Sequence, residues 1–445
     1  MNLRGRTYFT YLGLRGSTLP RRYREYLAAD ARGPSEDESR LRLARLLRHC
    51  AEQVPHYREI LRELPGPEKD PEDVLRRMPI LTKETIRDRF EQLKSLDLDG
   101  RRWFVNTSGG STGEPVRFIQ DAESSSQILA LLLAFSRWAG HEVGLPEVRV
   151  WGSEREVLHG TLGWRNRVVQ ALTRTTFFNA FRMTPEAMRG LARTLRTTRP
   201  KLVVAYAQAL YEFARFIESE GIDAPPVGAV ITSAGTLHPF MRSQIERVFR
   251  CPVYNRYGSR EVGVVGAERP GLDGMWVPPW NVIVEVVDEL GRPVPAGVDG
   301  EILVTLLVNY AMPFVRYRIG DRGALAPGRV RGGQILTRVL GRNVDVFRRR
   351  DGTLVDGEYF THLLYFRDWV DRFQFIQTSY EEVLLRIVSR GRDPRSLQTE
   401  VDEIATGTKA ALGPRTVLRV DWVKEIPASP SGKYRYTISE VPPPR

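Results

Sequence analysis

The fold is decided by Leu202-Val-Val-Ala205, Ala209–Glu220 and Val227-Gly-Ala-Val-Ile231, which are an apolar run, a helix-like stretch and a second apolar run in succession. Short apolar runs separated by helices are typical of the buried strands of parallel sheets. The alternation continues on the N-terminal side, where Val148-Arg-Val-Trp151 resembles a strand and Pro185–Thr197 resembles a helix. The pattern predicts an α/β protein with a largely parallel sheet.

The sequence on either side of this alternating region has other patterns. Between about residues 20 and 95, leucines recur at roughly helical spacing, and Thr82 stands where it would cap a helix. From about 275 to 341 the chain reads as short strands, such as Val282–Val287, between Gly and Pro turns. We therefore expect one N-terminal domain over residues 1–341, with a helical first part and a β-rich last part.

The remaining residues, 342–445, predict a small and mobile α+β domain. This part of the chain contains one helix-like run, Pro394–Thr406. It also contains three strand-like runs, Val344–Phe347, Phe373–Gln377 and Val383–Ile387. The pattern of helix-like and strand-like runs changes at Gly341-Arg342, which we take as the boundary between the two domains.

Composition excludes several classes of protein. The chain has 445 residues and only two cysteines, so neither a disulfide framework nor a cysteine-based zinc ribbon is expected. The longest apolar run, Ile128–Phe135, is far shorter than the roughly 20 residues of a membrane span. The N-terminus has no signal-peptide apolar core. These features predict a soluble, cytoplasmic protein without a membrane partner.

The net charge is +12, from 66 Lys and Arg against 54 Asp and Glu. Only seven of the cations are lysines, and the arginines are spread along the chain. Even the basic run Arg40–Arg48 is interleaved with leucines, whereas a nucleic-acid surface favours basic clusters with aromatics. We expect no nucleic-acid partner, although a phosphate-rich small substrate fits the charge.

The clearest motif is Asn106-Thr-Ser-Gly-Gly-Ser-Thr-Gly-Glu-Pro115. Its glycines let backbone N–H groups approach phosphate oxygens, and its hydroxyls add donors. It lacks the lysine of a Walker A loop. Gly109–Gly113 matches the nucleophile-elbow pattern, but the residues that follow read as a strand, where that motif needs a helix. The motif indicates a phosphate-binding loop, with a plain Gly/Ser loop as the alternative.

Three further stretches contain residues suited to nucleotide chemistry. In Tyr254-Asn-Arg-Tyr-Gly-Ser-Arg-Glu261, an aromatic can stack on a base and a carboxylate can hold Mg²⁺, although Tyr-Gly-Ser is also an ordinary turn. In Arg316-Tyr-Arg-Ile-Gly-Asp321, the aspartate after a strand could accept from ribose hydroxyls, or belong to a turn. In Ser429-Pro-Ser-Gly-Lys-Tyr-Arg435, one of the rare lysines stands on a flexible loop, where a surface lysine would ordinarily be solvated and idle.

These motifs, with Ser233-Ala-Gly-Thr-Leu237 and Gly341-Arg342, form an ordered series over most of the chain. The series resembles the acyl-adenylate-forming superfamily of acyl-CoA synthetases, adenylation domains and luciferases. Within it, the sequence is similar to the phenylacetate–CoA ligase-like branch, as Met78-Pro-Ile-Leu-Thr-Lys83 and Ala311-Met-Pro-Phe-Val-Arg-Tyr317 indicate.

The resemblance implies a fold, a reaction and a set of site residues. A carboxylate would attack the α-phosphorus of ATP with Mg²⁺ bound, giving acyl-AMP and pyrophosphate. Catalysis would come from Lys433, which bridges carboxylate and α-phosphate, and from Glu261, which binds the metal. The nucleotide-binding residues would be Ser108, Ser111 and Thr112 at the β/γ-phosphates, Gly235, Thr236, Asn255, Tyr257, Gly258 and Ser259 near the adenine and α-phosphate, Asp321 at the ribose, and Arg342 at the hinge. The substrate pocket would draw on Tyr206, Ala207, Ser233 and Ala234.

The sequence identifies neither the acid substrate nor the acceptor of the acyl group. Coenzyme A is the acceptor that the resemblance implies, but the position of the usual hinge acid is Val344. One alternative is an enzyme that adenylates the acid but forms an amide or a nucleotidylated product without coenzyme A. A second alternative, which is not an enzyme, is a catalytically silent protein that binds a nucleotide or a polyanion. Aromatics around Phe135–Trp138, Phe177–Phe181 and Tyr206–Gln208 fit a planar or aryl acid, although such residues also form cores. A homodimer is left open.

Overall fold

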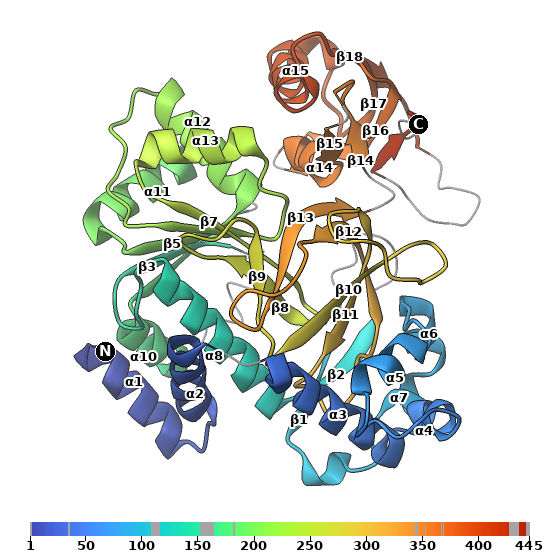
Figure 1. Cartoon of the computed structure of the whole chain (residues 1–445). Helices are drawn as coiled ribbons and strands as arrows, with labels where there is room; N and C mark the ends of the chain where they lie inside the picture. The colour runs from blue at the N-terminus through green and yellow to red at the C-terminus, as the bar shows by residue number, and fades with distance from the viewer. Residues whose placement is uncertain are drawn as a thin grey trace.

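The protein is described by a computed structural model. The described residues are 2–33, 36–107, 116–151, 164–180, 183–342, 346–351, 353–365, 367, 369–426 and 436–441. Figure 1 shows a large α/β body and, beside its upper end, a smaller α+β domain formed by the C-terminal part of the chain. Among the described residues, no helix is long and apolar enough to cross a membrane.

An eleven-stranded sheet forms the centre of the large body, in the order β10-β11-β12-β13-β9-β8-β7-β6-β5-β3-β4. Strands β7, β6, β5, β3 and β4 run parallel, and every pairing from β7 to β10 by way of β8 is antiparallel. The strands are β3 (Glu147–Val150), β4 (Thr175–Phe178), β5 (Leu202–Tyr206), β6 (Val230–Ser233), β7 (Val253–Ser259), β8 (Gly263–Glu268), β9 (Met275–Val277), β10 (Val282–Val287), β11 (Gly300–Leu306), β12 (Tyr317–Leu325) and β13 (Gln334–Arg342). The predicted α/β class is therefore confirmed, with β7 as the strand at which a parallel half meets an antiparallel half.

Helices cover the sheet in three groups (Figure 1). The parallel half is covered on one face by α11 (Pro185–Thr198), α12 (Ala207–Ser219) and α13 (Pro239–Phe249), which share an apolar cluster with β5, β6 and β7. A second group contains α1 (Leu3–Leu14), α2 (Leu19–Arg32), α8 (Ala122–Trp138) and α10 (Trp164–Thr173). A third group contains α3 (Glu36–Gln53), α4 (Pro55–Arg62), α5 (Pro71–Arg77), α6 (Lys83–Asp88), α7 (Phe90–Leu93) and the 3₁₀ turn η1 (Leu98–Gly100).

Two of these groups depend on local sequence signals. Thr82 caps α6 as predicted, because its hydroxyl accepts a hydrogen bond from the Thr85 amide at 3.2 Å. The helical N-terminal part begins earlier than the predicted residue 20, because α1 already starts at Leu3, where the Asn2 side chain accepts from the Gly5 amide. A hairpin of β1 (Trp103–Thr107) and β2 (Arg117–Asp121) connects this part to α8.

The C-terminal domain has a four-stranded sheet in the order β18-β17-β16-β19. Its strands are β16 (Val370–Ser379), β17 (Glu382–Ser389), β18 (Val417–Trp422) and β19 (Thr437–Ser439), with a small ladder of β14 (Val346–Arg348) and β15 (Leu354–Asp356), and its helices are α14 (Glu358–Tyr365), η2 (Pro394–Leu397) and α15 (Gln398–Leu412). Figure 1 shows α14 between this sheet and the large body.

A cluster of aromatic rings joins the two parts of the molecule. His238 and Phe240, at the start of α13, stack with ring centroids 5.6 Å apart. The ring of Tyr359 on α14 meets both of them edge-on, at 6.1 Å and 5.8 Å. Apolar residues of α12, α13 and the C-terminal domain consequently form one continuous buried cluster.

Two motifs adopt a different local structure from the predicted one. Asp321 lies inside β12 rather than after a strand, at a bulge where Gly320 has φ +97°. Tyr257-Gly258-Ser259 forms the end of β7, also at a bulge, rather than an ordinary turn. A bulge adds a residue to one strand and re-aims its side chains, which is why a turn-like sequence occurs within each strand.

Candidate active site

The carboxyl ends of three parallel strands lie along one edge of the sheet. Tyr206 at the end of β5 is in register with Ser233 at the end of β6, and Thr232 on β6 is in register with Asn255 on β7. Ligands of open α/β sheets bind outside such strand ends. The structure therefore brings together three of the predicted site residues, Tyr206, Ser233 and Asn255, along one edge.

The turn after β6 exposes backbone to this edge. Ala234 has φ +56°, a left-handed conformation that costs a non-glycine residue roughly 1–2 kcal/mol. Gly235 follows it, and a Cβ atom built on Gly235 would meet no heavy atom within 4 Å. Gly235 and Thr236 are both partly exposed. The segment thus presents main chain to open space, which is the property needed to approach a nucleotide closely.

A hydrogen bond connects β7 to β12, which lie four places apart in the sheet order. The hydroxyl of Tyr257 donates to Asp321 Oδ2 at 2.7 Å. Asn255, two residues before Tyr257 in β7, is also held in place, because its Oδ1 accepts from the Thr232 hydroxyl at 3.2 Å and its backbone amide donates to Glu268 at 2.8 Å. The predicted base-stacking and ribose-binding residues are therefore direct neighbours.

Glu261 lies in the turn between β7 and β8 and is buried, with 7% of its surface exposed. Its Oε1 accepts a hydrogen bond from the hydroxyl of Tyr317 at 3.2 Å. Tyr317 is fully buried and was not among the predicted site residues. The only sequence signal for it was its place in the Arg316–Asp321 motif, because the contact spans 56 positions.

The hairpin that flanks the Gly/Ser/Thr motif is attached to the same turn. Asn106 Nδ2 donates to Gln120 Oε1 at 3.0 Å, and Gln120 Nε2 in turn donates to the Arg260 carbonyl oxygen at 3.4 Å. Asn106 and Thr107 are the part of the motif that the structure describes, and the description resumes at Val116. Ser108, Ser111, Thr112 and Lys433 lie outside the described residues.

The remaining predicted residues have diverse surroundings. Arg342 is the last residue of β13, and its backbone is in register with Asp321. Gly258 is closely packed, because a Cβ atom there would lie 2.2 Å from the Gly263 carbonyl oxygen. Ser259 Oγ accepts from the Val262 amide at 3.4 Å in the turn that carries Glu261. Ala207 begins α12 and packs in the apolar cluster of that helix rather than facing solvent.

The aromatic residues expected around the acid divide into two groups. Phe135 is only 3% exposed and stacks on Trp138 at 4.5 Å in a core cluster with Trp276, so its role is packing. Tyr206, in contrast, is partly exposed and lies 4.5 Å from the ring of Trp151. An aromatic wall at the strand ends is thus formed by Trp151 and Tyr206.

Two family models match the chain: AMP-binding enzyme over residues 166–306, and CapK C-terminal domain over residues 347–440. Fold and matches together define an adenylate-forming, acid–thiol ligase-like enzyme of the acyl-adenylate-forming superfamily. Within that superfamily, the similarity is to the phenylacetate-coenzyme A ligase-like branch.

Named relatives agree with this assignment. The chain is 25% identical to Protein CapK of Staphylococcus aureus over 379 residues, which covers 82% of this chain and 80% of CapK. It is 26% identical to phenylacetate-coenzyme A ligase of Escherichia coli K12 over 329 residues, covering 68% of this chain and 70% of the ligase. The structure of 2-hydroxyisobutyryl-CoA ligase in the postadenylation state, in complex with R3-HIB-AMP, has the same fold, with a TM-score of 0.61, 19% identity, and coverage of 90% of this chain and 89% of that one.

Proposed function

We propose that this protein is an ATP- and Mg²⁺-dependent ligase that activates a small carboxylic acid and passes its acyl group to coenzyme A. The observation that carries the proposal is the hydrogen bond from Tyr257 to Asp321, with buried Glu261 on the turn that follows Tyr257. The aromatic ring expected at the base and the carboxylate expected at the ribose are thus in contact, and the carboxylate expected at the metal follows on the next turn of the chain.

The first half-reaction needs alignment and charge neutralisation more than covalent help from the protein. A carboxylate oxygen of the acid attacks the α-phosphorus of ATP, and the bond from that phosphorus to the bridging oxygen of the β-phosphate breaks. Acyl-AMP and pyrophosphate result. Lys433 would stabilise the charge that grows on the α-phosphate, and Ser108, Ser111 and Thr112 would hold the phosphates that leave.

Glu261 suits a magnesium ion that arrives with the nucleotide. Mg²⁺ is usually held by one or two carboxylates together with phosphate oxygens and waters, so a single protein carboxylate is sufficient. Tyr317 holds one oxygen of Glu261, which orients the other carboxylate oxygen. Across the described residues no group of three or more His, Cys, Asp and Glu could hold a metal by itself, so the chemistry of Glu261 fits a metal shared with phosphates.

In the second half-reaction, the sulfur of coenzyme A attacks the acyl carbonyl carbon, AMP leaves, and the thiol proton passes to solvent. Support for coenzyme A comes from relatives named phenylacetate-coenzyme A ligases. Support for the alternative, transfer to another acceptor, comes from the CapK similarity, which includes the C-terminal domain. The small domain carries Lys433, so rotation of that domain would remove the lysine and admit the acceptor.

The test is product analysis by mass spectrometry, with ATP, Mg²⁺ and a panel of aryl, fatty and short-chain acids, in the presence and absence of coenzyme A. We expect acyl-CoA and AMP when coenzyme A is present, and enzyme-bound acyl-AMP when it is absent. Acyl-AMP that accumulates unchanged in the presence of coenzyme A would overturn the acceptor but keep the adenylation.

A further inference from the structure

The inference concerns the far end of the acid and rests on the proposed function. Side chains of a strand alternate between the two faces of a sheet, so residues in register share a face. Tyr206 is in register with Ser233, and one step beyond the paired Thr232 and Asn255 stand Ser233 and Arg256. Arg256 therefore shares a face with Tyr206 and Ser233. We call Trp151, Tyr206, Ser233 and Arg256 the strand-end row.

This face is the one covered by α8 rather than by α11–α13. Arg256 is in register with Ala267, which packs in a cluster with Ala134 and Phe135 of α8. Asn255 and Tyr257, its neighbours in β7, point to the other face and make the contacts described above. Arg256 thus points to the opposite face of β7 from Asn255 and Tyr257, and it faces the side on which Trp151 and Tyr206 form an aromatic wall.

Among the described residues around Arg256, positive side chains outnumber negative ones. Arg149 donates to Glu147 Oε1 at 2.5 Å, and Glu147 is only 5% exposed, so that carboxylate is already engaged by one arginine. His141 Nε2 lies 3.8 Å from the other oxygen of Glu147. Within the described part of the chain, the Arg256 guanidinium has neither a hydrogen bond nor an ion pair. Among the described side chains, two arginines thus share one carboxylate, which leaves one of their positive charges without a described counter-charge.

Arg256 is desolvated by burial but is still partly exposed. Burial, and secondly the like charge of Arg149, lower the pKa of Arg256 to about 10, against the attraction of Glu147. The residue nevertheless keeps some exposed surface. A desolvated cation is costly without a counter-charge, and a planar guanidinium with several donors matches a carboxylate or a phosphate in a bidentate manner.

From this geometry we propose that the acid carries a second negative charge at the end remote from the reacting carboxylate, and that Arg256 binds it within the strand-end row. The substrate class is a dicarboxylate or a carboxylic acid with a phosphate or sulfate group. Trp151 and Tyr206 would contact the part of the molecule between the two charged ends.

The test compares acids that differ only in the charge of the remote group. Matched pairs are glutarate with monomethyl glutarate, terephthalate with monomethyl terephthalate, and 4-carboxyphenyl phosphate with its dimethyl phosphate ester. We expect the full chain to release pyrophosphate from ATP with at least one dianionic member at a kcat/KM roughly 100-fold above its uncharged partner. The phosphate pair and the carboxylate pairs distinguish the two kinds of remote anion.

Three variants complete the experiment. Arg256→Met should abolish the preference by lowering kcat/KM for the dianionic acid about 100-fold while the uncharged partner keeps its rate, and Arg256→Lys should restore part of it. Arg193→Met, on the exposed side of α11, is the control and should change neither. A wild-type preference for the uncharged acids, or an equal loss for both members of a pair in Arg256→Met, overturns the inference and leaves the proposed function intact.

Binding measurements keep the inference falsifiable without turnover. If no acid releases pyrophosphate, the proposed function fails. Calorimetric titration with the same pairs, in the presence of a non-hydrolysable ATP analogue, then tests whether Arg256 binds a remote anion. Binding of a dianion that is lost in Arg256→Met supports the inference, and equal or absent binding of both members overturns it.

Discussion

The hydroxyl of Tyr257 donates a 2.7 Å hydrogen bond to the carboxylate of Asp321, across 64 positions of sequence. This bond joins the parallel half of the sheet, which ends at β7, to the antiparallel half that contains β12. The two residues belong to separate motifs, each of which also suited an ordinary turn. Their contact brings the two motifs together and supports the proposal that both belong to one nucleotide site.

Tyr257→Phe removes this hydrogen bond and keeps the ring. Since a hydrogen bond to a charged group contributes about 1.5–3 kcal/mol, we expect the KM for ATP to rise roughly 10- to 150-fold. Steady-state pyrophosphate release with varied ATP measures the effect, and thermal unfolding controls for stability. An unchanged KM in a folded variant would mean that Tyr257 does not position Asp321 for the nucleotide.

Substitution by alanine should lower the stability of the protein at one glycine of the site and weaken ATP binding at another. Gly258→Ala places a methyl group 2.2 Å from the Gly263 carbonyl oxygen, so we expect a loss of roughly 1–3 kcal/mol in the free energy of unfolding. Gly235→Ala meets nothing within 4 Å, so its stability should be unchanged while the KM for ATP rises. Urea unfolding and kinetics separate the two effects, and a destabilised Gly235→Ala would contradict the assignment of Gly235 to ligand contact.

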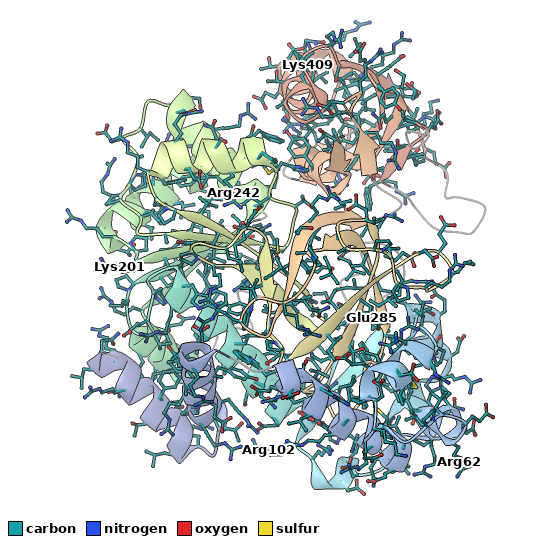
Figure 2. All side chains as sticks on the ribbon, viewed as in Figure 1. Arg62, Arg102, Lys201, Arg242, Glu285 and Lys409 are labelled. Atoms are coloured by element: carbon teal, nitrogen blue, oxygen red, sulfur yellow. The ribbon has the colours of Figure 1, made fainter. Side chains whose placement is uncertain are left out.

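Arg316 has a structural role although it belongs to the same motif as Asp321. It is 5% exposed, pairs with Glu285 at 3.1 Å and donates to the Met78 carbonyl oxygen at 2.7 Å, which ties the third helical group to β10 (Glu285 is labelled in Figure 2). Removing one partner of a buried pair leaves the other charge uncompensated, so Arg316→Met should cost about 3–5 kcal/mol in the free energy of unfolding.

The control for that prediction is an exposed ion pair. Arg292, with 70% of its side chain exposed, pairs with Asp288, and Arg292→Met should cost at most about 1 kcal/mol. Similar losses in the two variants, measured by urea unfolding, would contradict a structural role for the buried pair.

His238 makes the stability of the protein depend on pH. Burial lowers the pKa of His238 to about 4, and its Nε2 has no hydrogen-bond partner among the described residues. The unfolded chain therefore binds the proton more readily than the folded one, and stability is lost as pH falls from about 6.5 toward 4. At pH 5 the loss from this residue is about 2 kcal/mol.

The variant His238→Phe keeps an aromatic ring against Phe240 and Tyr359 but cannot be protonated. Its free energy of unfolding should fall less than that of the wild type between pH 7.5 and pH 5, by about 2 kcal/mol, in urea titrations at both pH values. Parallel pH profiles for the two proteins would show that His238 titrates normally in the folded state.

Lys433→Ala should separate the two half-reactions. Adenylation should fall by orders of magnitude, because the growing charge on the α-phosphate loses its cation, while thioester formation from supplied acyl-AMP should be largely retained. Rates of pyrophosphate release and of acyl-CoA formation measure the two steps. An equal loss in both would assign the lysine a different role.

Much of the fold could be predicted because its signals are local. The apolar runs at Val148, Leu202 and Val227 lie at β3, β5 and β6, since strands covered by helices on both faces are apolar throughout. The side-chain contacts of the site could not be predicted in this way. Tyr317 reaches Glu261 across 56 positions, and the sheet face on which Arg256 lies depends on strand register, which the sequence of one strand does not contain.

The central claim is that the strand-end site activates a carboxylic acid with ATP, and acid-dependent exchange of labelled pyrophosphate into ATP tests it most directly. With the acid panel and Mg²⁺, the full chain should catalyse exchange that depends on at least one acid and is lost in Lys433→Ala and Glu261→Gln. Exchange that is absent with every acid, or equal in the wild type and both variants, would contradict the account.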